Sequence, residues 1–222
     1  MRTFIKFSFA FTLLALVASC GSDKGKAAKT TDAVDTKAAP TAAAKSYTVS
    51  EGTITWVGSK VAYDHSGTLS VSAGTLSAEG NKIKSGDFTI DMASLKNTDL
   101  AEDPEKAGKL EGHLKSGDFF DVEKFPTATF SITSVADVDT DEANCNITGN
   151  LTMKGVTKSI TFPALVVAKA DGTLTAISDK FSIDRNDWGV KYGSGLSGAV
   201  GDNIISDEVG LQINLTAAAA VQ

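Results

Sequence analysis

The sequence predicts an all-β domain, a single antiparallel up-and-down β-barrel of about eight strands with one short helix inserted between strands. Three observations predict it. Apolar and polar residues alternate from Tyr47 to Thr216, and Gly, Asp or Asn interrupts the alternation about every ten residues. One stretch alone has apolar residues at helical spacing. Closing such strands into a barrel removes the edges that would otherwise pair with other chains.

The strands can be followed in order by the apolar residues that share one face. Ile54, Trp56 and Gly58 share a face of the first strand, because successive side chains in a strand point to opposite sides. Four further segments repeat the pattern, with the positions Phe88, Ile90 and Met92; Ala128, Phe130 and Ile132; Cys145, Ile147, Gly149, Leu151 and Met153; and Val209, Leu211, Ile213 and Leu215.

Two dipeptides predict tight turns between neighbouring strands. Asp171-Gly172 lies between two alternating runs, and Lys154-Gly155 follows Met153 in the same way. Glycine accepts the positive φ that hairpin turns require. Hairpins link strands that are neighbours in sequence, so they favour an up-and-down order.

The helix is expected within residues 94–118. Asp103 is a suitable N-cap, Pro104 suits the first turn, and Glu105 complements the positive end of the helix dipole. Gly117 is expected to end the helix. We expect this insertion to lie over one mouth of the barrel.

The N-terminal region predicts export and a lipid anchor. Two basic residues precede an apolar run of about eleven residues, too short for the roughly 20 that span a bilayer. The run ends in Leu16-Val17-Ala18-Ser19-Cys20, which resembles a bacterial lipobox, so residues 1–19 are predicted to be a lipoprotein signal peptide. Lipidation of Cys20 would attach the chain to a membrane surface. A plain signal peptide with an ordinary cysteine is the alternative.

The remaining divisions follow from composition. Residues 20–45 carry few large apolar side chains, and we expect them to form the lipidated cysteine and a flexible tether. The barrel is expected over 46–216 and a short tail over 217–222. No acidic residue directly follows Cys20, which favours the outer membrane, facing the periplasm.

The charge argues against a nucleic-acid partner. Loss of Arg2 and Lys6 with the signal peptide would leave 19 basic against 27 acidic side chains, whereas nucleic-acid binding needs a basic face. With Cys20 lipidated, Cys145 has no disulfide partner, and we interpret it as a small buried hydrophobic residue.

A specific resemblance then emerges from several segments that span nearly the whole domain. The chain resembles the YceI-like family in these segments, which occur in the family's order: Trp56–Lys60, His65–Gly67, Gly86–Leu95, His113–Asp121, Phe125–Phe130, Gly149–Lys158, Phe181–Arg185 and Trp188–Val190. Two departures are visible: Trp188 stands where the family commonly has Phe, and the lipobox and tether replace a simple signal peptide.

The resemblance implies a lipocalin-like barrel with an elongated apolar cavity that binds isoprenoid lipids, such as polyprenyl phosphates or quinones, in the periplasm. An eight-stranded barrel either is filled by its own side chains or encloses one slender ligand. The candidate cavity residues, each of which could instead be ordinary core, are Trp56, Phe88, Ile90, Met92, Phe119, Phe120, Phe130, Phe162, Phe181 and Ile183.

Two polar residues are candidates for contact with a ligand head group. His113 could donate to a phosphate or a quinone near the barrel mouth, or cap helix carbonyls instead. Arg185 lies in a strongly apolar segment, where it could neutralise a phosphate or pair with an aspartate at the surface.

Little in the sequence predicts catalysis. Two histidines and one free cysteine do not make a usual zinc site, and the common nucleophile and phosphate-loop motifs are absent, so we expect no metal, no cofactor and no enzyme activity. The main hypothesis is binding and carriage of an isoprenoid lipid. The alternatives are a ligand-free structural or stress-related envelope protein and, least favoured, a hydrolase or isomerase at His113 and Asp118. The sequence leaves a homodimer open.

Overall fold

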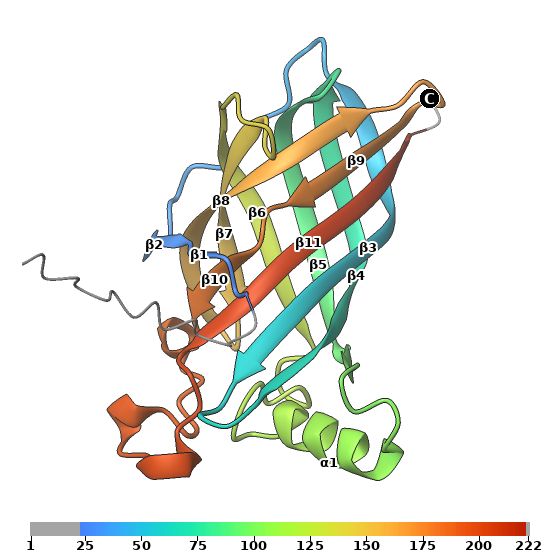
Figure 1. Cartoon of the computed structure of the whole chain (residues 1–222). Coiled ribbons are helices and arrows are strands. Elements are labelled where there is room, and N and C mark those ends of the chain that lie inside the picture. Colours follow the sequence, from blue (N-terminus) through green and yellow to red (C-terminus); the bar gives the residue numbers. More distant parts are fainter. Residues whose placement is uncertain (1–22, 221–222) are drawn as a thin grey trace, which may run out of the picture.

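The protein forms a closed, antiparallel β-barrel in the computed structural model, which describes residues 23–220 (Figure 1). Consecutive strands pair as neighbours around the barrel, and the pairing of the last strand with the first long strand closes it. The all-β, up-and-down barrel of eight strands with one short helix is confirmed. The predicted signal peptide and Cys20 lie outside the described residues.

The wall consists of six long strands, one strand position divided into two short strands, and a final long strand. The two short strands, β9 and β10, both pair with β11. The bounds are β3 Lys45–Ser59, β4 Asp64–Glu79, β5 Lys82–Asn97, β6 Thr127–Asp137, β7 Cys145–Met153, β8 Val156–Ala168, β9 Thr173–Ser178, β10 Phe181–Asp184 and β11 Glu208–Ala219.

The inward faces are those that the alternation predicted. Every second residue of β7 is buried from Cys145 to Met153, and Phe88, Ile90 and Met92 are buried on β5. The expected turns also form, with positive φ at both Lys154 and Gly155. Strand β11 continues to Ala219, so the wall extends three residues beyond the expected end at residue 216.

Helix α1, Pro104–Lys115, lies at the lower end of the barrel in Figure 1. Asp103 caps it by accepting a hydrogen bond from the Lys106 backbone N–H, and Pro104 occupies the first turn as predicted. The helix ends at Lys115, two residues before Gly117. Its Glu111 carboxylate accepts the Asn97 backbone N–H at 2.9 Å, which ties the helix to the end of β5.

Within the segment expected to be a flexible tether, residues 26–32 form two short strands that pair with the barrel wall. Strand β1, Lys26–Ala27, pairs in parallel with β10, and β2, Lys29–Asp32, pairs with β8. Composition could not show this pairing, because it depends on backbone groups. Strand β9 ends at Ser178, and β10, which follows it, does not pair with β8. This leaves a seam between β8 and β10, and residues 26–32 cover it by pairing with both strands.

The two ends of the barrel interior are packed differently. At the end with the β4–β5 and β8–β9 turns, Ala78, Val166, Leu174 and Ala217 are fully buried. The other end carries α1, the β3–β4 turn and the long loop between β10 and β11, and we call it the α1 end (Figure 1).

The wall is tightly packed around Gly149, so a substitution at this residue tests that packing. A Cβ built there would lie 2.4 Å from Phe130 Cζ and 2.7 Å from the Ser131 carbonyl oxygen. Gly149→Ala should therefore lower the free energy of unfolding by about 1–3 kcal/mol, measured by urea denaturation.

The matched control is Gly108→Ala, on the exposed face of α1, where no atom lies within 4 Å of an added Cβ. It should stabilise the protein by up to about 1 kcal/mol, because alanine favours helix. Equal effects at the two sites would contradict the packing described for β7.

Candidate functional site

Two adjoining apolar cavities lie inside the barrel, with volumes of about 90 Å³ and about 140 Å³. The first lies at mid-barrel and the second at the α1 end, bounded there by Leu114 of the helix. Both are lined by Ile54, Ile90, Leu151 and Leu211, so they follow one another inside the wall. The interior is therefore hollow from its middle to the α1 end.

A row of phenylalanine rings lines the mid-barrel cavity. The rings of Phe162 and Phe181 stack face to face with centroids 4.7 Å apart, and Phe130 lies 5.7 Å from Phe162. Phe88 continues the row at 6.3 Å from Phe130. Such rings offer a flat apolar surface to a hydrocarbon. The polar side chain among the residues that line this cavity is Ser178.

The structure brings all ten predicted apolar residues to these cavities. Phe88, Phe130, Phe162 and Phe181 line the mid-barrel cavity, and Ile90 lines both. The α1-end cavity is lined by the other five, which are Trp56, Met92, Phe119, Phe120 and Ile183.

Sequence reasoning missed several residues that line the α1-end cavity. Leu95 lies near the end of β5, Leu114 lies in α1, and Val190 and Ile205 lie in the β10–β11 loop. Leu114 has a helical signal in the sequence. Val190 and Ile205 have none, because an irregular loop has no period from which an inward side could be read.

Trp56 carries a buried polar atom that the protein does not satisfy. Its side chain lines the α1-end cavity, and within residues 23–220 its indole N–H has no hydrogen-bond partner. Most buried polar groups in proteins are paired, so an exception calls for an explanation. The indole of Trp188, by contrast, donates to the Leu151 carbonyl oxygen at 3.0 Å.

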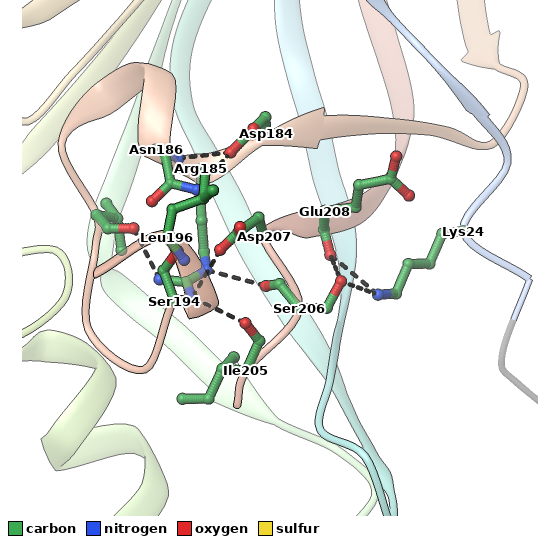
Figure 2. Close-up of polar contacts among 11 residues, drawn as sticks. Lys24, Asp184, Arg185, Asn186, Ser194, Leu196, Ile205, Ser206, Asp207 and Glu208 are labelled. Carbon is green, nitrogen blue, oxygen red and sulfur yellow. Dashed lines mark hydrogen bonds and ion pairs between the residues drawn. The ribbon is translucent and has the colours of Figure 1, made fainter. Parts of the chain in front are cut away.

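Arg185 is buried and holds the β10–β11 loop (Figure 2). Its guanidinium donates to the carbonyl oxygens of Val190 at 2.7 Å, Ser206 at 3.0 Å and Ile205 at 3.1 Å. Asp207 accepts a fourth, ionic contact at 3.4 Å. Burial lowers the pKa of Arg185, and the neighbouring Asp207 acts in the opposite direction. Arg185 therefore forms a buried set of contacts with the loop carbonyls of Val190, Ile205 and Ser206, instead of the surface ion pair considered from the sequence. We call this set of contacts the loop clamp.

His113 lies outside the cavities, at the α1 end. Its Nε2 is 3.1 Å from Asp118 Oδ2, and its ring packs edge-on against Phe119 and Tyr192, with centroids 5.0 Å and 4.9 Å away. Its imidazole thus has the Asp118 carboxylate as its polar partner instead of the helix carbonyl considered from the sequence. A head-group role for His113 or Arg185 stays a prediction.

A YceI-like domain model matches residues 47–217, which is most of the barrel. The chain belongs to the YceI-like family. A UPF0312 protein of Pseudomonas putida (strain GB-1) is 33% identical over 133 residues, covering 55% of this chain and 68% of the relative. A UPF0312 protein of Pseudomonas aeruginosa (strain LESB58) is 38% identical over 87 residues, which cover 37% of this chain and 44% of that protein.

Solved structures share the YceI-like barrel. BcnA of Burkholderia cenocepacia superposes with a TM-score of 0.58 at 25% identity, covering 74% of this chain and 95% of BcnA. A structure described as a polyisoprenoid binding domain from Saccharophagus degradans gives a TM-score of 0.55, covering 78% of this chain and 98% of that domain. Its identity is 16%, so the likeness concerns the fold.

Among residues 23–220, His, Cys, Asp and Glu side chains form no cluster of three or more that could hold a metal ion. The same residues include no helix long and apolar enough to span a bilayer.

The contacts of Arg185 with the loop carbonyls should stabilise the YceI-like barrel. Arg185→Met should lower the free energy of unfolding by about 3 kcal/mol, because it leaves buried carbonyl oxygens without donors. Urea denaturation measures this change. Lys191→Met, an exposed change in the same loop, should alter stability by no more than about 0.5 kcal/mol. A loss below about 1 kcal/mol for Arg185→Met would show that the loop does not depend on this guanidinium.

Proposed function

We propose that the barrel binds a long, slender apolar lipid of the isoprenoid type, such as a polyprenyl phosphate or a quinone, and carries or stores it at the cell envelope. The observation that carries this proposal is the pair of adjoining apolar cavities between the phenylalanine row and the α1 end. The shared fold of the Saccharophagus degradans polyisoprenoid binding domain supports the same ligand class.

The size of the cavities favours a thin chain over a compact ligand. Pockets for drug-sized molecules have volumes of roughly 300–1,000 Å³, whereas the two cavities measure about 90 Å³ and about 140 Å³. A hydrocarbon chain one carbon wide needs length rather than breadth. Each buried CH₂ contributes about 0.8 kcal/mol, so the part of an apolar chain that enters these cavities gains binding energy without any polar contact.

The unsatisfied indole N–H of Trp56 supports a ligand that also carries an acceptor oxygen. Trp56 lines the α1-end cavity, and a carbonyl or phosphate oxygen there would give its N–H a partner. A pure hydrocarbon would leave this donor unpaired, at a cost of about 1–3 kcal/mol. The polar end of the ligand is therefore proposed to lie at the α1 end, with its tail directed towards the phenylalanine row.

The remaining features of the proposal rest on the sequence. We propose a protein without catalytic activity and without a resident cofactor, exported and anchored through lipidated Cys20 to the outer membrane, facing the periplasm. A ligand-free envelope protein that acts through protein contacts is the competing function. The unfilled apolar space supports the ligand-binding function over this alternative, because a ligand-free scaffold gains nothing from space that its own side chains leave open.

Native mass spectrometry of the protein purified from its own host tests the proposal. We expect a co-purifying apolar species with a mass of several hundred daltons, released when the protein is unfolded. A clean ligand-free mass under conditions that preserve the fold would contradict the proposal and favour the competing function.

Ala128→Leu extends this experiment, because Ala128 lines the α1-end cavity and a larger side chain would occupy that space. The variant should lose most of the bound species while keeping its thermal unfolding midpoint within a few degrees. Ala93→Leu, on the exposed face of β5, is the matched control and should retain the ligand. Equal retention by both variants would place the ligand outside the cavity.

A further inference from the structure

The most exposed large apolar side chains gather at the α1 end. Among the described residues, five such side chains are 47–82% exposed: Val61, Tyr63, Tyr192, Leu196 and Val200. The first two belong to the β3–β4 turn, and the others to the β10–β11 loop. We call these five residues the mouth rim. Monomeric proteins seldom gather exposed apolar side chains in this way without a binding role.

Backbone contacts make the mouth rim one surface. Lys60 in the β3–β4 turn pairs with Ile205, and the Ser206 N–H donates to the Ser59 carbonyl oxygen at 2.8 Å. Ile205 in turn donates its N–H to the Gly193 carbonyl oxygen at 2.7 Å. This hydrogen bond joins the first part of the β10–β11 loop to its last part. The turn and the loop therefore lie side by side.

The mouth rim is continuous with the cavity. The Tyr192 ring lies 5.2 Å from Phe119, which is buried and lines the α1-end cavity. Val190 and Ile205 of the same loop also line that cavity. An apolar molecule could thus pass between the mouth rim and the interior along apolar side chains.

The charge of this surface suits a lipid bilayer. Residues 60–63 and 189–204 carry two lysines, Lys60 and Lys191, and one acidic residue, Asp202, although the whole chain has a formal charge of −6. This surface therefore lacks the acidic excess that bacterial membrane phosphates would repel. Tyr63 and Tyr192 also suit this position, because tyrosine is enriched at membrane interfaces. Its apolar ring can contact the lipid while its hydroxyl stays in water.

The start of the described chain lies at the same end of the barrel. Lys24 Nζ donates to Ser206 Oγ and to the Glu208 carbonyl oxygen, both at 3.0 Å (Figure 2). The predicted lipid anchor, Cys20, lies four residues earlier, and four residues span at most about 14 Å. An acyl anchor at Cys20 would hold this end of the barrel, rather than the packed end, near the bilayer.

We infer that the mouth rim docks onto the surface of a lipid bilayer, so that the α1-end cavity faces the membrane from which it takes its lipid. The inference rests on the proposed function for the identity of the cargo. The docking itself depends on the exposed side chains and on the position of Lys24.

Site-specific fluorescence on the full chain tests the docking. An environment-sensitive dye is attached to each of three cysteine variants, Leu196→Cys, Val200→Cys and Asn81→Cys. Each labelled variant is then mixed with vesicles of phosphatidylethanolamine and phosphatidylglycerol. Burial raises the pKa of the Cys145 thiol to about 11, so this residue should not react at neutral pH. The parent chain, labelled in parallel, gives the background from Cys20.

We expect the dyes at residues 196 and 200 to shift to shorter wavelength and to be quenched by lipid-attached quenchers. The dye at residue 81, in the β4–β5 turn at the packed end, should do neither. Emission from 196 and 200 that matches that from 81 would overturn the docking. Quenching that needs a second copy or an added protein instead of lipid would also overturn it.

A paired variant separates this inference from the proposed function. Leu196→Asp with Val200→Asp should slow transfer of a fluorescent polyprenyl lipid from vesicles by at least about tenfold, because two apolar contacts with the bilayer are lost. The lipid bound at equilibrium should be unchanged. If the dyes report contact but the parent chain never takes up lipid, the docking stands and the proposed function fails. Unchanged transfer would show that the mouth rim does not serve loading.

Discussion

The pairing of β11 with β3 is the constraint on which the rest of the molecule depends. It closes the sheet, and its register places Trp56 opposite Leu211 and Ile54 opposite Ile213. In a strand, a slip of one residue would turn every side chain to the other face. Closure in this register therefore decides which residues share the interior. What they form there depends on their size and on the volume that they leave open.

The interior is filled at one end and hollow at the other, and this asymmetry connects the fold with the proposed function. Small and branched residues such as Ala78, Val166 and Leu174 fill the end that carries the short hairpins. At the α1 end, the β10–β11 loop borders a cavity of about 140 Å³, and Arg185 holds this loop by donating to three of its carbonyl oxygens. Because the opposite end is packed, a ligand is proposed to enter at the α1 end, where the mouth rim lies.

Much of the barrel could be predicted because period-two alternation shows which side chains of a strand share one face, and the eight candidates that lie on strands line the cavities. The helix was predicted from its cap, Asp103, for an equally local reason. The sequence could not predict features that depend on non-local geometry. Val190 and Ile205 reach the cavity from an irregular loop, and residues 26–32 pair with strand edges left open when β9 ends. The role of Arg185 was also hidden, because its partners are backbone carbonyls some 5 to 21 residues away.

The proposed function requires that a slender ligand occupy the space between the phenylalanine row and Trp56. The most direct measurement is a high-resolution crystal structure of the protein purified from its own host. We expect continuous, elongated density through both cavities, with a polar end within hydrogen-bonding distance of Trp56 Nε1. An interior filled by repacked side chains, or by isolated water molecules alone, would contradict it.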